Sequence, residues 1–470
     1  MPRMITRPAL GATLLLAAFA GADAAQAQAA AVRCAGPPSA PVAAGRAPER
    51  EPTVQDYEQL LLRVPRNARD HYDHGVLHER MGQHNSAILD YTQAVVLDPC
   101  LAQAYERRGA AYASQGRFES ALQDLDEAIR IDANSASAYV NRGAAYEALG
   151  QNERARADYD RAVALDPQYA NAYVRRGASF ELTGEFDRAL REYDAAIRID
   201  PNSAQAYFFR GRTLIRQRQF ERALADLDLA LRLDPRDAKA HQSRAAVFAA
   251  LGDNAHAIAD YSAAIGLDAQ YALAYQGRGD AYARAGQRDA ALQDYAAAIR
   301  LNPKSAYAYY SRGLVLAGNG EHQRAVEDLD QAIVRDPDLA LAFRHRGMSQ
   351  QKLGRIERAV ADFESAIRLD ARDTIALNEL AWLLATSNQA QWRDGARAVE
   401  LARTACNLGG WKVPDLFDTY AAALAEAGRF GDAVKWQEAA LESAEFERAH
   451  GDGARARLRL YREGKPYRAP

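Results

Sequence analysis

One segment of the chain recurs at a fixed spacing of 34 residues. The copy at residues 102–135 reads AQAYERRGAAYASQGRFESALQDLDEAIRIDANS, and close copies begin at Ala136, Ala170 and Ala204. A constant period of this length is typical of repeat proteins, in which each copy is one small structural unit that stacks on its neighbours. The length of 470 residues therefore does not by itself predict a number of globular domains.

The pattern inside each copy predicts two antiparallel helices. When Ala102 is counted as position 1, position 8 is glycine or alanine, positions 20 and 27 are alanine, and positions 4, 11 and 24 are often aromatic. Small residues let two helices approach closely, and rings fill the remaining space. Glycine at position 15, as in Gly116 and Gly150, supplies the turn, and Asp-Pro near position 32 ends the second helix. We expect successive hairpins to stack.

These residues closely resemble the tetratricopeptide repeat, and the resemblance covers most of the chain. It implies an all-α fold, a right-handed superhelical solenoid of about eleven stacked helix-turn-helix repeats. We expect nine contiguous repeats at residues 68–373 and two divergent repeats at residues 374–447. Atypical terminal segments are expected in such arrays, so residues 53–67 are predicted to be an N-terminal cap and residues 448–470 a C-terminal cap or tail.

The beginning of the chain predicts export. Arg3 and Arg7 precede an apolar run at residues 9–22, and small residues suited to cleavage follow, which is typical of a bacterial signal peptide at residues 1–27. The run is shorter than the roughly 17 to 25 residues of a membrane-spanning helix. We therefore expect a periplasmic protein, or one secreted or bound to the envelope, without an integral membrane segment after cleavage. Residues 28–52, rich in alanine and proline, are predicted to be a flexible linker.

Charge and motifs exclude several function classes. A net charge of -3 gives no basic stripe for nucleic acid. The S-x-x-K match at residues 349–352 lacks its companion motifs, and neither a G-x-S-x-G elbow nor a phosphate loop is present. We predict that the chain is not an enzyme and carries no cofactor.

The three cysteines have no metal or redox spacing. Cys34, Cys100 and Cys406 lie far apart in the sequence. In an oxidising compartment Cys34 is able to pair with Cys100, which leaves Cys406 buried and free. Three unpaired thiols are the alternative.

Histidines gather in the first copy. His71, His74 and His78 fall at helical spacing, so their imidazoles either meet as metal ligands or pack as polar-tipped core residues. No carboxylate or cysteine completes a ligand set at suitable spacing, so we favour packing and predict no metal site. A pH-sensitive cap is a further interpretation.

Two positions depart together from the usual pattern of the family. Position 7 is arginine in eight consecutive copies, from Arg108 to Arg346, and position 23 in the same copies is acidic, from Asp124 to Asp362. In the tenth and eleventh copies both positions become apolar, so we infer that the two side chains touch. A solvated pair contributes less than about 1 kcal/mol. We favour a partly buried ladder that fixes the register between helices.

In the family that the chain resembles, a concave groove carries function. It is lined by the first helix of each hairpin at about positions 2, 5, 9, 12 and 13. Those positions form a basic patch in copies five and six and a more aromatic, apolar surface in copies eight and nine. The candidate partner-binding residues are Phe208, Arg212, Arg216, Lys239, Tyr307, Tyr310, Leu314, Arg344 and Met348. Ordinary solvated groove residues are the alternative.

Such a surface suits an extended peptide, because aromatic side chains act as anchors and arginines pair with carboxylates. We expect a non-enzymatic scaffold or adaptor of the bacterial cell envelope whose partner is another protein or a peptide segment. The alternative is an accessory scaffold of an exopolysaccharide export or envelope-assembly system that contacts glycan. We also expect the double substitution Tyr310→Ala and Arg344→Ala to weaken partner capture while leaving thermal stability nearly unchanged.

Overall fold

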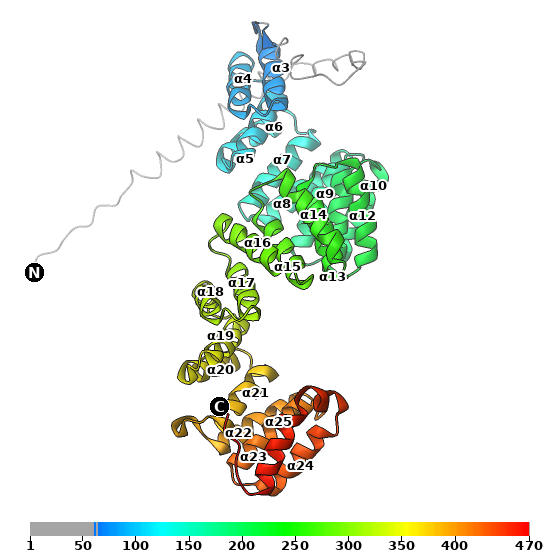
Figure 1. Ribbon diagram of the computed structural model, residues 1–470. Helices are drawn as coiled ribbons and strands as arrows, with labels where there is room; N and C mark the ends of the chain where they lie inside the picture. The colour runs from blue at the N-terminus through cyan, green and yellow to red at the C-terminus, as the bar shows by residue number, and fades with distance from the viewer. Residues whose placement is uncertain (1–60, 63, 470) are drawn as a thin grey trace, which may run out of the picture. The chain divides into compact units, whose positions relative to one another are not determined.

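A computed structural model describes residues 61–62 and 64–469, and the regular elements of these residues are all helices (Figure 1). The chain divides into two compact units, Met1–Pro235 and Arg236–Pro470. The predicted signal peptide at residues 1–27, the predicted linker at residues 28–52 and most of the predicted cap at residues 53–67 lie outside the described residues.

The first unit contains five helical hairpins, each made of two helices joined by a short turn. Their helices are α3 (Ala68–Arg80), α4 (His84–Leu97), α5 (Ala102–Ser114), α6 (Phe118–Ile131), α7 (Ala136–Ala148), α8 (Asn152–Leu165), α9 (Ala170–Leu182), α10 (Phe186–Ile199), α11 (Ala204–Arg216) and α12 (Phe220–Leu233).

The second unit contains six further hairpins and one additional C-terminal helix. Its elements are α13 (Ala238–Ala250), α14 (Asn254–Leu267), α15 (Ala272–Arg284), α16 (Arg288–Leu301), α17 (Ala306–Gly318), α18 (His322–Arg335), α19 (Ala340–Lys352), α20 (Ile356–Leu369), α21 (Thr374–Thr386), the 3-10 turn η1 (Ala390–Trp392), α22 (Gly395–Leu408), α23 (Pro414–Glu426), α24 (Phe430–Leu441) and α25 (Ala444–Arg462). The described residues therefore form eleven hairpins, the number that the sequence predicts. The boundary predicted at residue 447 falls inside α25.

The turn inside each hairpin needs a left-handed residue. Gly116 and Gly150 both have φ of 74° at position 15, where glycine pays no steric penalty because it has no Cβ. In the fifth repeat Arg218 occupies this position with φ of 59°. A residue with a Cβ is disfavoured there by about 1 to 2 kcal/mol, so this hairpin retains its turn at some cost in stability.

The predicted close packing of the two helices is confirmed. The alanines at position 20, for example Ala121, Ala155 and Ala223, are completely buried. At position 8 a Cβ on Gly143 would lie 2.6 Å from the ring of Tyr159 at position 24. Because real Cβ atoms do not approach so closely, glycine at this position is required by the ring that packs on it.

The sixth repeat solves this packing differently. It carries Ala245 at position 8, and its ring at position 24, Tyr261, lies against Gly277 of the seventh repeat. A Cβ on Gly277 would lie 2.4 Å from Cζ of Tyr261. The larger residue in one repeat is thus accompanied by a glycine in the next.

Apolar residues replace the ladder in the last two repeats. The rings of Tyr420 and Trp436, at positions 7 and 23 of the eleventh repeat, have centroids 5.6 Å apart. Leu380 and Leu401, at the same positions of the tenth, belong to one core cluster. The joint switch thus corresponds to a ring contact in the eleventh repeat and to a shared core in the tenth.

Candidate functional site

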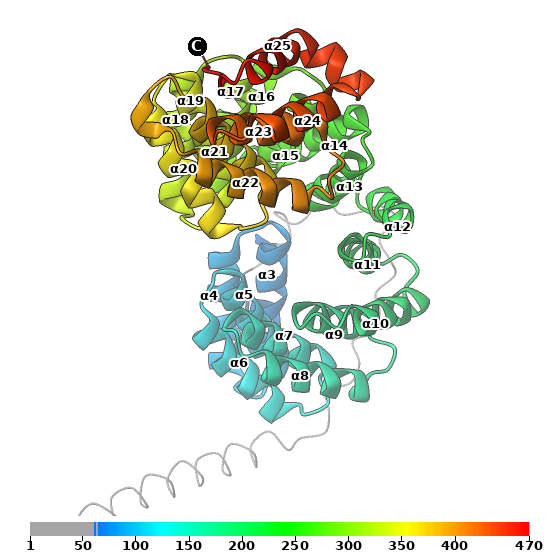
Figure 2. The same ribbon diagram turned by 90° about the horizontal axis from the view of Figure 1, so that it is seen from below.

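We call the side of a unit formed by positions 2, 5, 9, 12 and 13 of its first helices the inner face. In the first unit α5, α7, α9 and α11 contact one another in turn, and the second helices lie outside them (Figure 2). In the second unit α13, α15, α17, α19 and α21 do the same. This arrangement places the side chains that the sequence proposes for binding on the first helices of each unit.

The predicted contact between positions 7 and 23 is confirmed in all eight repeats. In the third repeat the Arg142 guanidinium donates from Nε and Nη2 to the two carboxylate oxygens of Asp158, at 2.8 and 2.7 Å. Asp158 is only 6% exposed. The other pairs are Arg108–Asp124, Arg176–Glu192, Arg210–Asp226, Arg244–Asp260, Arg278–Asp294, Arg312–Asp328 and Arg346–Asp362.

Several ladder arginines also reach the preceding repeat. Arg142 Nη1 donates to Asp126 at position 25 of the second repeat, at 2.8 Å. Arg210 and Arg346 make the same contact with Asp194 and Asp330. The pKa of Arg142 is raised because Asp158 and then Asp126 accept its hydrogen bonds, although burial opposes the rise. The ladder therefore joins repeats as well as helices, and these guanidinium groups are paired with carboxylates of the unit itself.

In the first repeat histidines contact the acidic ladder residue. Nδ1 of His71 lies 3.2 Å and Nε2 of His78 lies 3.4 Å from the carboxylate of Asp90, which stands at position 23. Position 7 of this repeat is His74. Within residues 61–62 and 64–469, no group of three or more histidine, cysteine, aspartate or glutamate side chains is placed to hold a metal ion.

The cysteines differ in environment. Cys406 is a free thiol buried in the core of the second unit, and burial raises its pKa to about 12. Cys100 is disulfide-bonded. Its predicted partner, Cys34, lies outside the described residues.

The predicted basic patch of the first unit is paired internally. Glu181 of α9 is buried and lies 2.8 Å from Nη2 of Arg212 and 3.2 Å from Nε of Arg216. The phenol of Tyr193 donates to the same carboxylate at 3.4 Å, and its pKa is raised by burial and then by Glu181. Phe208 is 8% exposed and packs on the ring of Phe209. Lys239 lies in the second unit, where it is exposed.

The predicted aromatic surface of the second unit is only partly exposed. Tyr307 is 49% exposed, whereas Tyr310 is 8% exposed. Leu314 and Met348 are partly buried against core clusters. Arg344 donates from Nη1 to both carboxylate oxygens of Asp373, at 3.0 and 3.1 Å.

Other exposed residues on the inner face extend this surface. Leu273, Leu341 and Ile375 share position 2 with Tyr307 in the seventh to tenth repeats, and each is exposed. We call these four residues the apolar row. Leu273, Leu341 and Ile375 are absent from the candidate partner-binding residues that the sequence gives, although the change of position 2 from polar to apolar after the sixth repeat is visible in the sequence.

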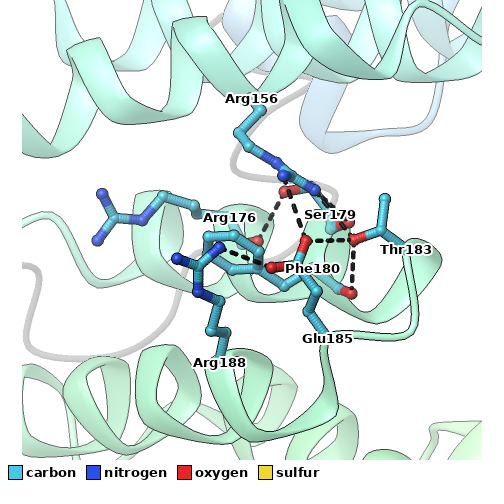
Figure 3. A network of polar contacts seen from close by, with 7 residues as sticks. All are labelled: Arg156, Arg176, Ser179, Phe180, Thr183, Glu185 and Arg188. Carbon is cyan, nitrogen blue, oxygen red and sulfur yellow. Dashed lines mark hydrogen bonds and ion pairs between the residues drawn. The ribbon is translucent and has the colours of Figure 1, made fainter.

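A network of polar contacts joins the third and fourth repeats on the side of the turns (Figure 3). Arg156 of α8 donates to the side chain of Thr183 at 3.1 Å and lies 4.6 Å from the centre of the Phe180 ring. Arg188 lies over the same ring at 5.3 Å and donates to Glu185 at 2.6 Å. Because the partners of these groups lie within the unit, we assign the network a structural role.

The titration of His345 gives a test of the packing around Tyr310. Its ring packs on Tyr310 with centroids 5.8 Å apart, and its Nε2 lies 3.2 Å from Nη2 of Arg344. Burial, and then the charge of Arg344, lower the pKa of His345 to about 4, although Asp373 opposes this. In the unfolded chain the pKa is about 6.5, so the folded state disfavours the protonated imidazole.

The contribution of neutral His345 to stability should be complete above about pH 6.5 and should fall by roughly 2 to 3 kcal/mol as the pH drops to 4. Urea unfolding at pH 7 and pH 4.5 measures this loss. His345→Gln should reduce the loss, whereas His450→Gln, at an exposed position, should not. An equal pH dependence in His345→Gln and the wild-type chain would contradict the expectation.

No helix in the described part of the chain is both long enough and apolar enough to cross a membrane.

Known sequence families match the repeats of the chain. The family described as "Tetratricopeptide repeat" matches residues 140–204, 277–340 and 345–406, a second family of the same description matches residues 182–247, and the family described as "TPR repeat" matches residues 109–150. No curated protein sequence matches the chain.

Solved structures are similar to parts of the chain. YrrB, described as a TPR protein with an unusual peptide-binding site, is 27% identical over 39% of this chain and 95% of its own, with a TM-score of 0.35. MamA is 26% identical over 36% of this chain and 92% of its own, with a TM-score of 0.33. Yeast Tom70 is 16% identical over 84% of this chain and 96% of its own, with a TM-score of 0.38.

The sequence matches together span more than half of the chain and coincide with its helical hairpins. The chain therefore belongs to the tetratricopeptide repeat family.

Proposed function

We propose that the chain is a non-enzymatic scaffold that binds an extended segment of another protein on the inner face of its second unit. The observation that carries this proposal is the apolar row. Leu273, Tyr307, Leu341 and Ile375 are 57%, 49%, 40% and 49% exposed. They occupy the same position in four successive repeats, so they form one line across α15, α17, α19 and α21.

Packing does not require large apolar residues at this position. In the first six repeats position 2 is polar: Arg69, Gln103, Ser137, Asn171, Gln205 and Lys239. The hairpins fold in the same way with either kind of residue. Because exposed apolar side chains that gather in one place mark interaction surfaces, the row supports binding of a partner through apolar anchors.

The spacing of the row favours an extended segment. Helices in contact lie about 8 to 10 Å apart. A polyproline II segment advances about 3.1 Å per residue with three residues per turn, so one face returns roughly every 9 Å. A partner segment with an apolar side chain at every third residue therefore brings one anchor to each repeat.

The row favours protein over glycan. Three of its four members are aliphatic, and of Tyr307 and Tyr310 only Tyr307 is substantially exposed. A glycan-binding surface would draw on the flat faces of several exposed rings. We keep glycan as an alternative outcome of the test below.

The proposed location is the bacterial cell envelope, most simply the periplasm. The support for it is the sequence pattern of residues 1–27, in which two arginines precede an apolar run and small residues. A scaffold exported in this way would meet its partner segment outside the cytoplasm.

Selection from a random twelve-residue peptide library, followed by fluorescence anisotropy with the selected peptides, tests the proposal. We expect peptides with an apolar residue at every third position, and at least tenfold weaker binding when the four residues of the row are changed to serine. The matched control changes Leu267, Val334 and Leu369, exposed residues of second helices, to serine and should bind normally. Equal binding by both variants would refute the role of the row. The glycan alternative would be favoured if the wild-type chain bound a labelled polysaccharide and the row variant did not.

A further inference from the structure

The C-terminal tail of the chain, residues 465–469, has no regular secondary structure and contacts the first helices of the last two repeats. The backbone N–H of Ala469 donates to the carbonyl oxygen of Thr386 at 2.8 Å. The ring of Tyr467 packs on Trp382, with centroids 6.0 Å apart. Trp382 and Thr386 stand at positions 9 and 13 of the tenth repeat, so the tail lies on the inner face.

A charged contact fixes the next side chain of the tail. Nη1 of Arg468 lies 2.6 Å from Oε2 of Glu426, which stands at position 13 of the eleventh repeat. The other oxygen of Glu426 accepts a hydrogen bond from Nε of Arg393 at 3.1 Å. The carboxylate is thus held by the scaffold and oriented toward the arginine of the tail.

The floor of this site is formed by buried groups outside the tail. Arg457 of α25 lies 5.3 Å from the centre of the Trp382 ring and 5.5 Å from that of Tyr467. Asp418 accepts two hydrogen bonds from this guanidinium, at 3.0 and 2.8 Å, and a third from Gln437 at 2.7 Å. Tyr467 and Arg468 of the tail are partly buried, and Tyr467 packs against the core cluster of the second unit.

We propose that the inner face of the tenth and eleventh repeats is a site for an extended protein segment in which an aromatic residue is directly followed by arginine. The ring packs beside Trp382 and Arg457, and the arginine pairs with Glu426. The chain's own tail, with Tyr467 and Arg468, fills this site until a partner segment of the same chemistry displaces it.

This site is separate from the apolar row. Its residues stand at positions 9 and 13 of the last two repeats and on α25, whereas the row uses position 2 of the seventh to tenth repeats. The inference therefore does not depend on the proposed function.

The tail competes strongly with any added peptide because it is covalently attached. A short tether gives a local concentration of the order of millimolar. The full chain should therefore bind an added peptide weakly. A full chain with the tail released by Tyr467→Ala and Arg468→Ala should bind the same peptide much more tightly.

Fluorescence anisotropy with the labelled peptide GKPYRAP, the sequence of residues 464–470, tests this difference. We expect at least tenfold tighter binding to the released chain than to the wild-type chain. A peptide with alanine in place of Tyr467 should lose binding, and Glu426→Gln in the released chain should weaken binding about tenfold. A released chain that also carries serines in the apolar row should still bind, which separates the two sites.

Two results would overturn the proposal. One is equal binding, or no binding, by the released and wild-type chains when circular dichroism shows both to be folded. The other is loss of cooperative unfolding in the released chain and also in a second variant that ends after Gly464. In that case the tail is a structural cap and not an exchangeable ligand.

Discussion

Replacing Arg142 with leucine is expected to lower the free energy of unfolding by about 3 to 5 kcal/mol. The substitution leaves Asp158 buried between two helices without its cation. An isolated buried carboxylate is costly because neither water nor a partner compensates its charge. Asp126 also loses its contact, but its side chain is 57% exposed and remains solvated. Urea unfolding followed by circular dichroism, together with hydrogen exchange in α7 and α8, measures the change.

The double variant Arg142→Leu, Asp158→Leu should recover most of this loss. The tenth repeat already has leucine at both positions, Leu380 and Leu401, in place of the ion pair. Replacing a buried ion pair with apolar residues is often nearly neutral, whereas removing one partner is not. A single variant within about 1 kcal/mol of the wild type would show that the pair is a solvated surface contact. A double variant as unstable as the single one would show that the loss does not come from the unpaired carboxylate of Asp158.

The repeat period and the joint switch of positions 7 and 23 were sufficient to predict the hairpins and the ladder. The additional contact of the ladder with position 25 of the preceding repeat was not predictable in the same way. That position holds Asp126 in one repeat, Ser262 in another and Ala296 in a third. A contact that varies from copy to copy leaves no period in the sequence.

The inner face was predictable as a set of positions but not as a set of exposed residues. Position 5 shows why. Gln276 accepts a hydrogen bond from Ser305, and Arg344 donates to Asp373, the last residue of its repeat in each case. Ser305 and Asp373 in turn cap the first helix of the next repeat. Position 5 therefore often stabilises the junction between repeats, which the sequence of a single hairpin does not show.

The position of the tail was also not predictable from the repeat pattern. Tyr467 and Arg468 have no counterpart in other copies, and their contacts with Trp382 and Glu426 join residues far apart in the sequence. The sequence predicts a cap or tail at residues 448–470, and the structure adds that its last residues lie along the inner face.

The double substitution Tyr310→Ala and Arg344→Ala is expected to destabilise the second unit by about 4 kcal/mol or more. This corrects the expectation of a nearly neutral change that the sequence gives. Removing the ring of Tyr310 leaves a cavity beside Leu329, because the side chain is buried. Removing Arg344 leaves Asp373 without its cation, although the backbone N–H groups of α21 still donate to it.

Urea unfolding measures the free energy of unfolding of this double variant and of a control, Tyr307→Ala with Arg284→Ala. The control residues are exposed on the same face. The control should lie within about 1 kcal/mol of the wild type, as is usual for surface positions. If the Tyr310→Ala, Arg344→Ala variant had the same free energy of unfolding as the wild type, position 5 would face solvent and would belong to the binding surface. If it is destabilised as expected, a loss of partner binding in that variant reflects a disturbed junction between repeats. Only substitutions in the apolar row then report on binding itself.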